Sequence, residues 1–415
     1  MRPGISRTGS KTDPFMTVFE SGTPPRIPPI AFLGLLAAIS PLSLGIPVQS
    51  VPDIAATFDA PYGAAQLVVS AFLMSFAVSQ LIVGPLSDRC GRKPVLYGGL
   101  LVYALASIGA ALAPSIEILI TARVIQGAGG CAALITPRAV VQDTHRGIEA
   151  ARMMAFVAML QSVAPSVGPI VGGGIDALLG WRWIFGFLTL LAGCMALGAA
   201  IWLDETRPVT GGQVTGWTTI LTRYARLFRS RLYVGYTLTF TFGTTGYFGY
   251  LAVGPALVIE NLGHPPLEFS LSLMVIATQF VAGAWVASRL VRRLGTDRIL
   301  WIAIAGITAP SLTLLFVARD PGLVALVLPF MVFGFFNGFI FPNALAGATS
   351  IDPRIAGSAS SFLGFAQLGT GAIVSFALSN LPTADAVPLG CCMVLLGALA
   401  GVGMVLVHTA RRDSE

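Results

Sequence analysis

Charged side chains are scarce in this sequence of 415 residues. Asp, Glu, Lys and Arg together make up 11% of the chain, whereas hydrophobic residues make up 55% and the mean hydropathy is +0.80. One soluble core cannot hide so much apolar surface. The composition therefore excludes an ordinary soluble domain and indicates a protein whose solvent is lipid.

Groups that carry common chemistries are also few. The chain has two lysines, Lys11 and Lys93, and no G-x-x-x-x-G-K-[ST] loop, which argues against an ATP-driven pump. Its three histidines, His145, His264 and His408, lie far apart in the sequence and indicate neither a metal site nor a catalytic pair. The five cysteines fall in one loop and in apolar segments, which implies no disulfide framework. We expect no enzyme activity, no cofactor and no metal.

Apolar runs long enough to cross a bilayer as helices recur along the chain. Twelve are predicted, at Pro29–Val51, Gly63–Leu86, Pro94–Ala113, Ile116–Pro137, Arg152–Leu179, Trp181–Leu203, Leu232–Ile259, Glu268–Leu290, Ile299–Val317, Gly322–Ala346, Ile355–Leu381 and Val387–His408. Prolines interrupt several of these runs, which neighbouring helices in a membrane bundle can tolerate. The fold class predicted is therefore an all-α membrane protein.

The chain repeats itself at a spacing of just over 200 residues. SRLVRRLGTDRIL begins 204 positions after GPLSDRCGRKPVL, FPNAL begins 205 after TPRAV, and Gln367 follows Gln161 by 206. Such offsets predict two halves of the same orientation. The predicted organisation is a disordered cytoplasmic tail (1–28), a six-helix bundle (29–203), a cytoplasmic linker (204–231), a second six-helix bundle (232–408) and a cytoplasmic tail (409–415).

Basic residues fix the predicted orientation. With both termini in the cytoplasm, 22 of the 25 lysines and arginines fall in cytoplasmic segments, Arg138 among them, because the fourth span is predicted to end at Pro137. Two lie in outer loops, and Arg123 alone lies within a span. The pI near 9.3 therefore reports membrane topology, and we expect no nucleic-acid partner.

A short charged loop, GPLSDRCGRKPVL from Gly84 to Leu96, stands out from its apolar surroundings. Its notable residues are Gly84, Asp88, Arg89, Gly91, Arg92 and Lys93. We expect Gly84 to allow close helix contact, Gly91 to allow a tight turn, and Asp88 to accept hydrogen bonds from Arg92 or from amides at a helix N-terminus. This arrangement predicts a latch between two helices; the alternative is a solvated loop that only fixes topology.

Two further features lie within spans. The segment APSVGPIVGG contains Pro165, Gly168, Pro169, Gly172 and Gly173, which are expected to form one small-residue wall that packs against the other half, or else ordinary helix packing. Arg123 lies about 10 Å deep at about 1.5 Å per residue, where an unpaired charge is costly and usually functional. The alternative is a structural arginine bonded to carbonyls that Pro41 or Pro47 leaves free.

Polar residues within the spans are candidates for substrate contact. They are Gln126, Gln161, Tyr236, Tyr247, Asn337, Asn343 and Gln367. A mixture of a few polar groups with aromatic walls is typical of small-molecule sites. Interhelical hydrogen bonding is the alternative role for each of them.

These segments together resemble the major facilitator superfamily. GPLSDRCGRKPVL resembles its loop between helices 2 and 3, Arg123 in ITARVIQGAGG its helix 4 arginine, and APSVGPIVGG the helix 5 motif of its drug:proton antiporters. The segments WRWIF, DETRP, FPNAL and AGSASSFLGFAQ resemble the bicyclomycin and chloramphenicol resistance (Bcr/CflA) branch. The resemblance implies twelve transmembrane helices in two six-helix bundles, a gating role for the loop, proton coupling through Arg123, and export.

One acidic residue expected in that branch is missing. Relatives carry an acid on helix 1, seven positions before a proline, and counting back from Pro52 reaches Gly45. No carboxylate then remains deep in the predicted bundle. We therefore expect neutral or anionic substrates in preference to cations, with coupling through Asp53 or Asp176 near the outer mouth and Glu260 less favoured.

The sequence predicts a monomeric multi-pass protein of the bacterial inner membrane. We expect it to export small amphipathic compounds or drugs by alternating access, with protons as the counter-transported ion. The alternative is a metabolite or sugar-type facilitator or symporter of the same fold.

Overall fold

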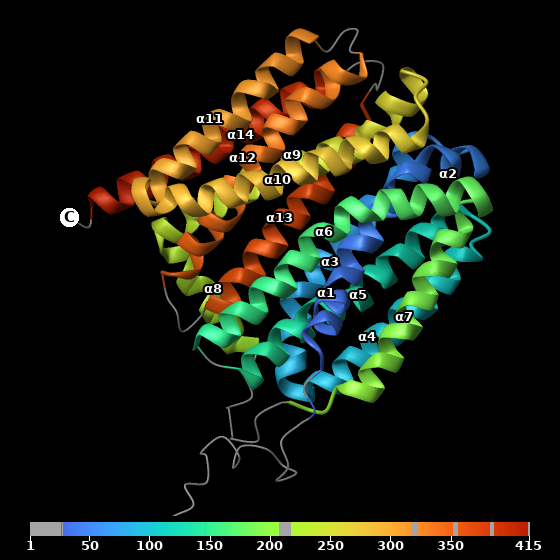
Figure 1. The fold of residues 1–415 in the computed structure, drawn as a ribbon, viewed down its shortest axis with the longest axis horizontal. Coiled ribbons are helices and arrows are strands. Elements are labelled where there is room, and N and C mark those ends of the chain that lie inside the picture. Colours follow the sequence, from blue (N-terminus) through green and yellow to red (C-terminus); the bar gives the residue numbers. More distant parts are fainter. Residues whose placement is uncertain are drawn as a thin grey trace, which may run out of the picture.

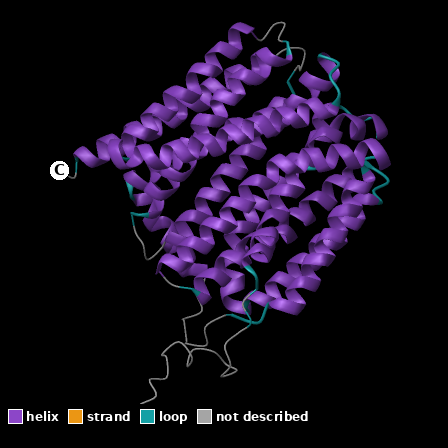
Figure 2. Ribbon diagram, in the orientation of Figure 1, coloured by secondary structure: helices purple, strands orange, loops and turns teal. Residues whose placement is uncertain are grey.

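The computed structural model describes residues 26, 28–145, 147–206, 217–317, 322–351, 356–381 and 386–413. Within these ranges the chain forms helices and connecting loops and no strand (Figure 2). Most of the predicted tail 1–28, residues 207–216 of the predicted linker and the last two residues lie outside the described part.

The helices form two groups that lie side by side (Figure 1). The first half consists of α1 (Ile30–Gly45), the short 3-10 helix η2 (Val48–Ser50), α2 (Val51–Thr57), α3 (Tyr62–Cys90), α4 (Arg92–Ala111), α5 (Ile116–Thr144), α6 (Gly147–Leu179) and α7 (Arg182–Trp202). The second half consists of α9 (Arg231–Pro255), the π-helical turn η3 (Ala256–Asn261), α10 (Pro266–Leu294), α11 (Thr296–Val317), α12 (Leu323–Thr349), α13 (Ala356–Ser379) and α14 (Val387–Arg412).

The helices have the lengths and surfaces expected in a bilayer. Eleven segments of the described chain are long and apolar enough to span, and α6, with 33 residues, occupies the position of the remaining predicted span. Large apolar side chains such as Leu112, Leu178 and Phe316 are at least 75% exposed, which suits contact with lipid. The predicted fold class is confirmed.

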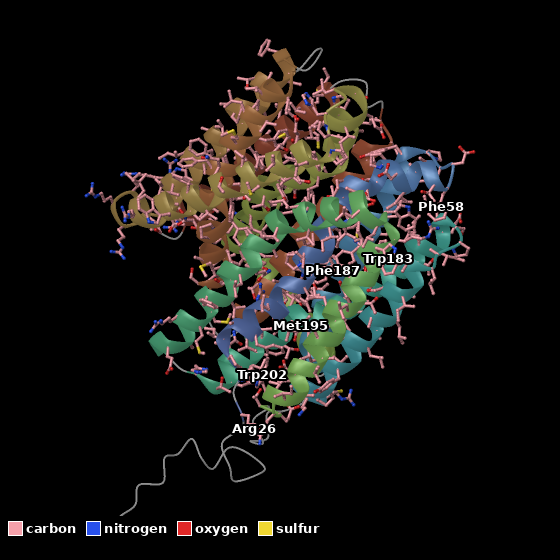
Figure 3. All side chains as sticks on the ribbon, turned by 45° about the vertical axis from the view of Figure 1, so that its right-hand side comes forward. Arg26, Phe58, Trp183, Phe187, Met195 and Trp202 are labelled. Carbon is pink, nitrogen blue, oxygen red and sulfur yellow. The ribbon has the colours of Figure 1, made fainter. Side chains whose placement is uncertain are left out.

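Helix α7 shows how one span meets both membrane surfaces. Trp183, Phe187, Met195 and Trp202 follow one another along it (Figure 3). The exposed Trp183 and Trp202 stand at its two ends, as interfacial tryptophans do.

Two span ends differ from prediction at prolines, and a helix lies within the predicted linker. The first span continues past Val51 to Thr57, because Pro52 is accommodated in the first turn of α2. Helix α5 continues past Pro137 to Thr144, so the prediction that Arg138 lies outside the span is wrong. The predicted linker contains α8 (Trp217–Arg229), whose Tyr224 and Phe228 contact Phe362 of α13, with ring centroids 5.9 and 4.7 Å away.

The two ends of the bundle differ in how the halves meet. We call the end with Cys90, Thr144, Leu294 and Arg412 the basic end, and the other the opposite end. At the opposite end Tyr62 Oη donates to the Ala252 carbonyl (2.7 Å), and Ser270 Oγ donates to the Pro169 carbonyl (3.2 Å). Helices α6 and α10 converge toward this end and diverge toward the basic end (Figure 1). The halves are therefore joined by hydrogen bonds at the opposite end.

Close packing of α6 on the first span gives a testable contrast between two glycines. An added Cβ at Gly172 meets the Ile46 carbonyl oxygen and Gln49 Nε2, whereas nothing lies within 4 Å of one at Gly174. We expect Gly172→Ala to destabilise the protein by about 1–3 kcal/mol through overpacking. Thermal unfolding of the purified protein measures the effect, with Gly174→Ala as the matched control. Equal melting temperatures for the two variants would contradict this packing.

Candidate functional site

The charged loop forms a sharp turn between α3 and α4. Gly91 has φ +100°, a conformation that favours glycine, and Arg92 begins α4. Pro94 lies in the first turn of α4. Nothing lies within 4 Å of an added Cβ at Gly84, so the close helix contact expected there is absent. The turn therefore depends on Gly91 and not on Gly84.

Arg92 joins three elements at this turn. Its Nη1 lies 2.5 Å from Asp88 Oδ1, and its Nε lies 2.9 Å from Asp143 Oδ2 at the end of α5. The Asp88 side chain is 64% exposed, whereas the Asp143 side chain is 11% exposed. The predicted pair of Asp88 with Arg92 is present, and the better shielded partner is Asp143, which lies 51 residues away in sequence.

Glu205, just beyond α7, caps the first turn of α4. Its carboxylate accepts hydrogen bonds from the backbone amides of Arg92 (2.9 Å) and Lys93 (3.1 Å). Of the two kinds of donor considered for Asp88, Arg92 is the one present, because Glu205 occupies the backbone amides. An added Cβ at Gly91 would lie 2.6 Å from Glu205 Oε2, so the glycine is needed for this approach as well. Arg89 is exposed beside the turn. Three carboxylates on α3, α5 and the segment after α7 therefore hold the basic end of the first half together.

The second half carries a different network at the same end. Asp297, near the start of α11, accepts a hydrogen bond from Tyr236 Oη (2.7 Å) and pairs with Arg411 Nε (3.0 Å). Arg411 also donates to Tyr236 Oη (2.9 Å). Tyr236, predicted to line a substrate cavity, is 2% exposed and instead joins α9, α11 and α14. Each half thus has its own charged clamp at the basic end.

Arg123 is fully buried in α5 and is surrounded by acceptors. Its Nε donates to the Val68 carbonyl (2.7 Å), its Nη2 donates to the Ser43 carbonyl (3.2 Å), and its Nη1 donates to Gln126 Oε1. The Phe72 ring lies 4.1 Å from the guanidinium carbon. Ser43 is four residues before Pro47, which has no N–H to donate to that carbonyl. The structural role considered for Arg123 is therefore present in the geometry.

Gln126 takes part in the same network. Its side chain is 0% exposed, and its Nε2 donates to Ser107 Oγ on α4 (2.6 Å). Ser43 Oγ in turn hydrogen-bonds Tyr103 Oη. The structure places Gln126, a predicted cavity residue, inside the first half and in contact with Arg123.

The glycines of the helix 5 motif lie on two faces of α6 and not on one wall. Gly168 and Gly172 face Gly45, Ile46 and Gln49 of the same half. Pro169 and Gly173 lie toward Ser270 on α10 of the other half, and Gly173 also lies near Gln49. The side chain of Pro165 lies outside the described residues. The motif therefore packs its own half together and also meets the second half.

The two predicted coupling carboxylates occupy different environments. Asp176 is half-buried in α6 and accepts a hydrogen bond from Ser50 Oγ of η2. Asp53 and Glu260 are exposed at the same end. Asp176 is therefore the carboxylate built into the packing of the opposite end.

The remaining predicted cavity residues are spread over both halves. Gln367 of α13 donates to Thr244 Oγ1 (2.9 Å), and Asn343 donates to the Phe339 carbonyl of its own helix (2.8 Å). Asn337 is 6% exposed, and Tyr247 is half-buried. Gln161 of α6 accepts a hydrogen bond from Arg138 Nη2 (2.8 Å), a contact that the sequence analysis missed.

The two acidic partners of Arg92 provide a first test of this site. Asp143→Asn removes the shielded charge beside Arg92, whereas Asp88→Asn removes an exposed one, and exposed ion pairs contribute at most about 1 kcal/mol. We expect Asp143→Asn to lower the melting temperature more than Asp88→Asn does. We also expect Asp88→Asn to reduce transport while folded protein stays in the membrane. A larger loss of stability in Asp88→Asn would contradict the assignment of Asp143 as the main partner.

Arg123 provides a second test. Arg123→Ala leaves the Ser43 carbonyl and the Gln126 amide oxygen without their donor, and each unpaired buried group costs about 1–3 kcal/mol. We expect a clear fall in melting temperature together with lost or uncoupled transport, and partial rescue by Arg123→Lys. The exposed Arg412, replaced by alanine, is the control. Unchanged stability and transport in Arg123→Ala would show that neither role applies.

Comparison with known proteins gives one family. A family model described as Major Facilitator Superfamily matches residues 33–375. The chain is 31% identical over 382 residues to an uncharacterized MFS-type transporter, YdgK, of Bacillus subtilis, covering 90% of this chain and 95% of the relative. It is 30% identical over 374 residues to multidrug resistance protein D of Escherichia coli, covering 89% and 93%. A chloramphenicol resistance protein of Pseudomonas aeruginosa is 32% identical over 281 residues, covering 66% and 65%.

A solved structure shows the same fold. The crystal structure of a bacterial homolog to the human lysosomal transporter Spinster, in an inward-facing and occupied conformation, aligns with a TM-score of 0.69 at 15% identity and covers 92% of this chain and 96% of that chain. The family match over most of the length, the relatives of at least 30% identity and the two six-helix halves confirm the predicted resemblance. The chain belongs to the major facilitator superfamily.

Proposed function

We propose that this protein is a secondary transporter that exports small amphipathic compounds or drugs across the bacterial inner membrane. The observation that carries the proposal is the similarity, over about nine-tenths of the chain, to a protein named for multidrug resistance. Further relatives are named for chloramphenicol and bicyclomycin resistance. These names favour export over the metabolite or sugar-type alternative.

The arrangement of the two halves supports alternating access. The halves are hydrogen-bonded at the opposite end, while α6 and α10 diverge toward the basic end (Figure 1). With the basic end in the cytoplasm, as the distribution of arginines favours, the hydrogen-bonded end faces the outside, and α6 and α10 diverge toward the cell interior. The clamps around Arg92 and Asp297 hold each half together at its basic end, so that each can move as one body.

The positions of the acids support a preference for neutral or anionic substrates. The described acids within the spanning helices, such as Asp143 and Asp176, lie near helix ends, whereas Arg123 lies deep in α5. A buried carboxylate would attract cations, and a buried arginine has the opposite effect. We propose that ethidium-like cations are poor substrates beside neutral amphenicol-type compounds.

Proton coupling is proposed to use Asp176. This carboxylate is half-buried between η2 and α6, where protonation would weaken its bond with Ser50 and alter the contact between these elements. Asp53 is exposed, and its side chain has less to change on protonation.

Transport into proteoliposomes under an imposed pH gradient tests the proposal. We expect uptake of chloramphenicol, driven by the gradient, and little uptake of ethidium. Asp176→Asn should abolish the dependence on the gradient, because the residue can no longer bind and release a proton. Asp53→Asn tests whether Asp53 is the coupling carboxylate in place of Asp176, and Asp59→Asn at the same end is the control.

Two results would contradict the proposal. The absence of any drug or dye transport by the wild type would count against export. Strong gradient-driven ethidium export that survives both Asp53→Asn and Asp176→Asn would count against the substrate preference and the coupling residue.

A further inference from the structure

Arg138 is a second arginine inside α5, and its head group points into the protein. It lies six residues before the last residue of α5, about 9 Å from the helix end at about 1.5 Å per residue. Its Nη2 donates to Gln161, fourteen residues into α6 and thus about 21 Å from the start of that helix. Long basic side chains near a helix end ordinarily turn back to the membrane surface. This one reaches toward the middle of the bundle.

Arg138 differs from the other buried arginines in lacking a full set of partners. Arg92 has two carboxylates, and Arg123 has two carbonyls, an amide oxygen and an aromatic ring. Among the residues that the structure describes, Arg138 makes its one hydrogen bond with the neutral Gln161 and has no carboxylate oxygen within 4.0 Å. An arginine in a bilayer-spanning segment needs compensation for its charge. The missing counter-charge is the first indication of a ligand.

The free donors of this pair are accessible. Arg138 and Gln161 are half-buried. Those of their nitrogens that have no partner in the described chain are not fully buried. Helix α1 lies between α5 and α6: Ser40 donates to the Gly130 carbonyl on one side, and Gly34 faces Leu160 on the other. The Arg138–Gln161 hydrogen bond therefore bridges the two helices that flank α1, and α6 borders the other half through Pro169 and Ser270.

The internal repeat allows a comparison with the second half, where the same two positions carry no charge. TPRAV in the first half aligns with FPNAL in the second, which places Asn343 at the position of Arg138. Asn343 bonds the Phe339 carbonyl of its own helix. Gln367, at the position of Gln161, bonds the neutral Thr244. The same two helix positions are thus filled by two neutral residues in one half and by an arginine and a glutamine in the other.

We propose that Arg138 and Gln161 form a binding site for the anionic group of amphipathic organic acids, carboxylates above all. A guanidinium offers paired N–H donors that match the two oxygens of a carboxylate. Gln161 uses its oxygen for Arg138, which leaves its amide N–H groups for the same anion. The inference rests on the proposed export function and specifies the residues that would select anionic over neutral substrates.

Equilibrium dialysis of the full-length protein in lipid nanodiscs tests the site. The probes are chloramphenicol hemisuccinate, which carries a carboxylate, its neutral parent chloramphenicol, and ethidium as a cation. We expect the wild type to bind the hemisuccinate most tightly. Arg138→Asn, which installs the residue found in the second half, should weaken hemisuccinate binding at least about ten-fold and leave chloramphenicol binding nearly unchanged. Arg138→Lys should retain part of the preference.

Controls separate this inference from the proposed function. Arg293→Gln removes an exposed positive charge from α10 at the basic end and should change none of the three affinities. Equal loss of all three probes in Arg138→Asn, or no loss of hemisuccinate, would overturn the site. The site would also be overturned if the wild type bound the hemisuccinate no more tightly than chloramphenicol. This outcome does not depend on whether the variant folds. A wild type that binds the probes with this preference but transports none of them would contradict the export function and not the site.

Discussion

A bilayer core contains no water, so each polar group in these helices has to find its partner within the bundle. The environment of Arg123 shows the consequence most clearly. Pro47 breaks the first span and leaves the Ser43 carbonyl without its usual donor, and the Arg123 guanidinium takes that place while it also binds Val68 and Gln126. The break in the first span and the buried arginine therefore depend on each other, and through them α1, α3 and α5 are held in one arrangement.

The same constraint explains why the two halves differ where they carry charge. Arg92 has carboxylate partners on α3 and α5, whereas in the second half Asp297 is held by Arg411 and Tyr236. Each half therefore has an internally satisfied clamp at its basic end, built from different residues. The hydrogen bonds between the halves lie at the opposite end, where Tyr62 and Ser270 bond backbone carbonyls across the interface, and α3 also packs along α13, with Gln80 close to Gly364. Bundles that are firmly held internally and hydrogen-bonded to each other at one end are suited to rocking.

The number and order of the spans were predictable, because a bilayer demands long apolar runs and the sequence contains them. Pro52 and Pro137 misled the boundary predictions, since a proline that would end a soluble helix is tolerated in a membrane bundle. Helix α8 was missed, because it is an amphipathic linker helix and not a span. The sharp turn at Gly91 and the pair of Asp88 with Arg92 followed from local sequence, since their residues lie within five positions.

The site beyond that turn was less accessible to sequence reasoning. Asp143 and Glu205 lie far from Arg92 in the chain, and nothing local to either acid indicates its partner. For Gly168 and Gly172 the sequence left open contact with the other half or ordinary helix packing, and their face of α6 lies against the first span. Arg138 was counted as a surface charge, because its position relative to the span depended on the misplaced helix end. Residues four positions apart share one face of α6, so the sequence separates the two faces. Only the packing shows which neighbour each face meets.

The central claim is that the two halves move as bodies, closing one end as the other opens. Pulsed electron paramagnetic resonance on the protein in lipid measures it most directly, with the native cysteines replaced and spin labels in pairs on α6 and α10. One pair, at Leu178 and Leu267, reports the opposite end, and the other, at Arg152 and Arg293, reports the basic end. When substrate or a pH gradient shifts the protein between its two conformations, the account predicts that one distance lengthens as the other shortens. Distances that stay fixed, or that lengthen and shorten together, would contradict it.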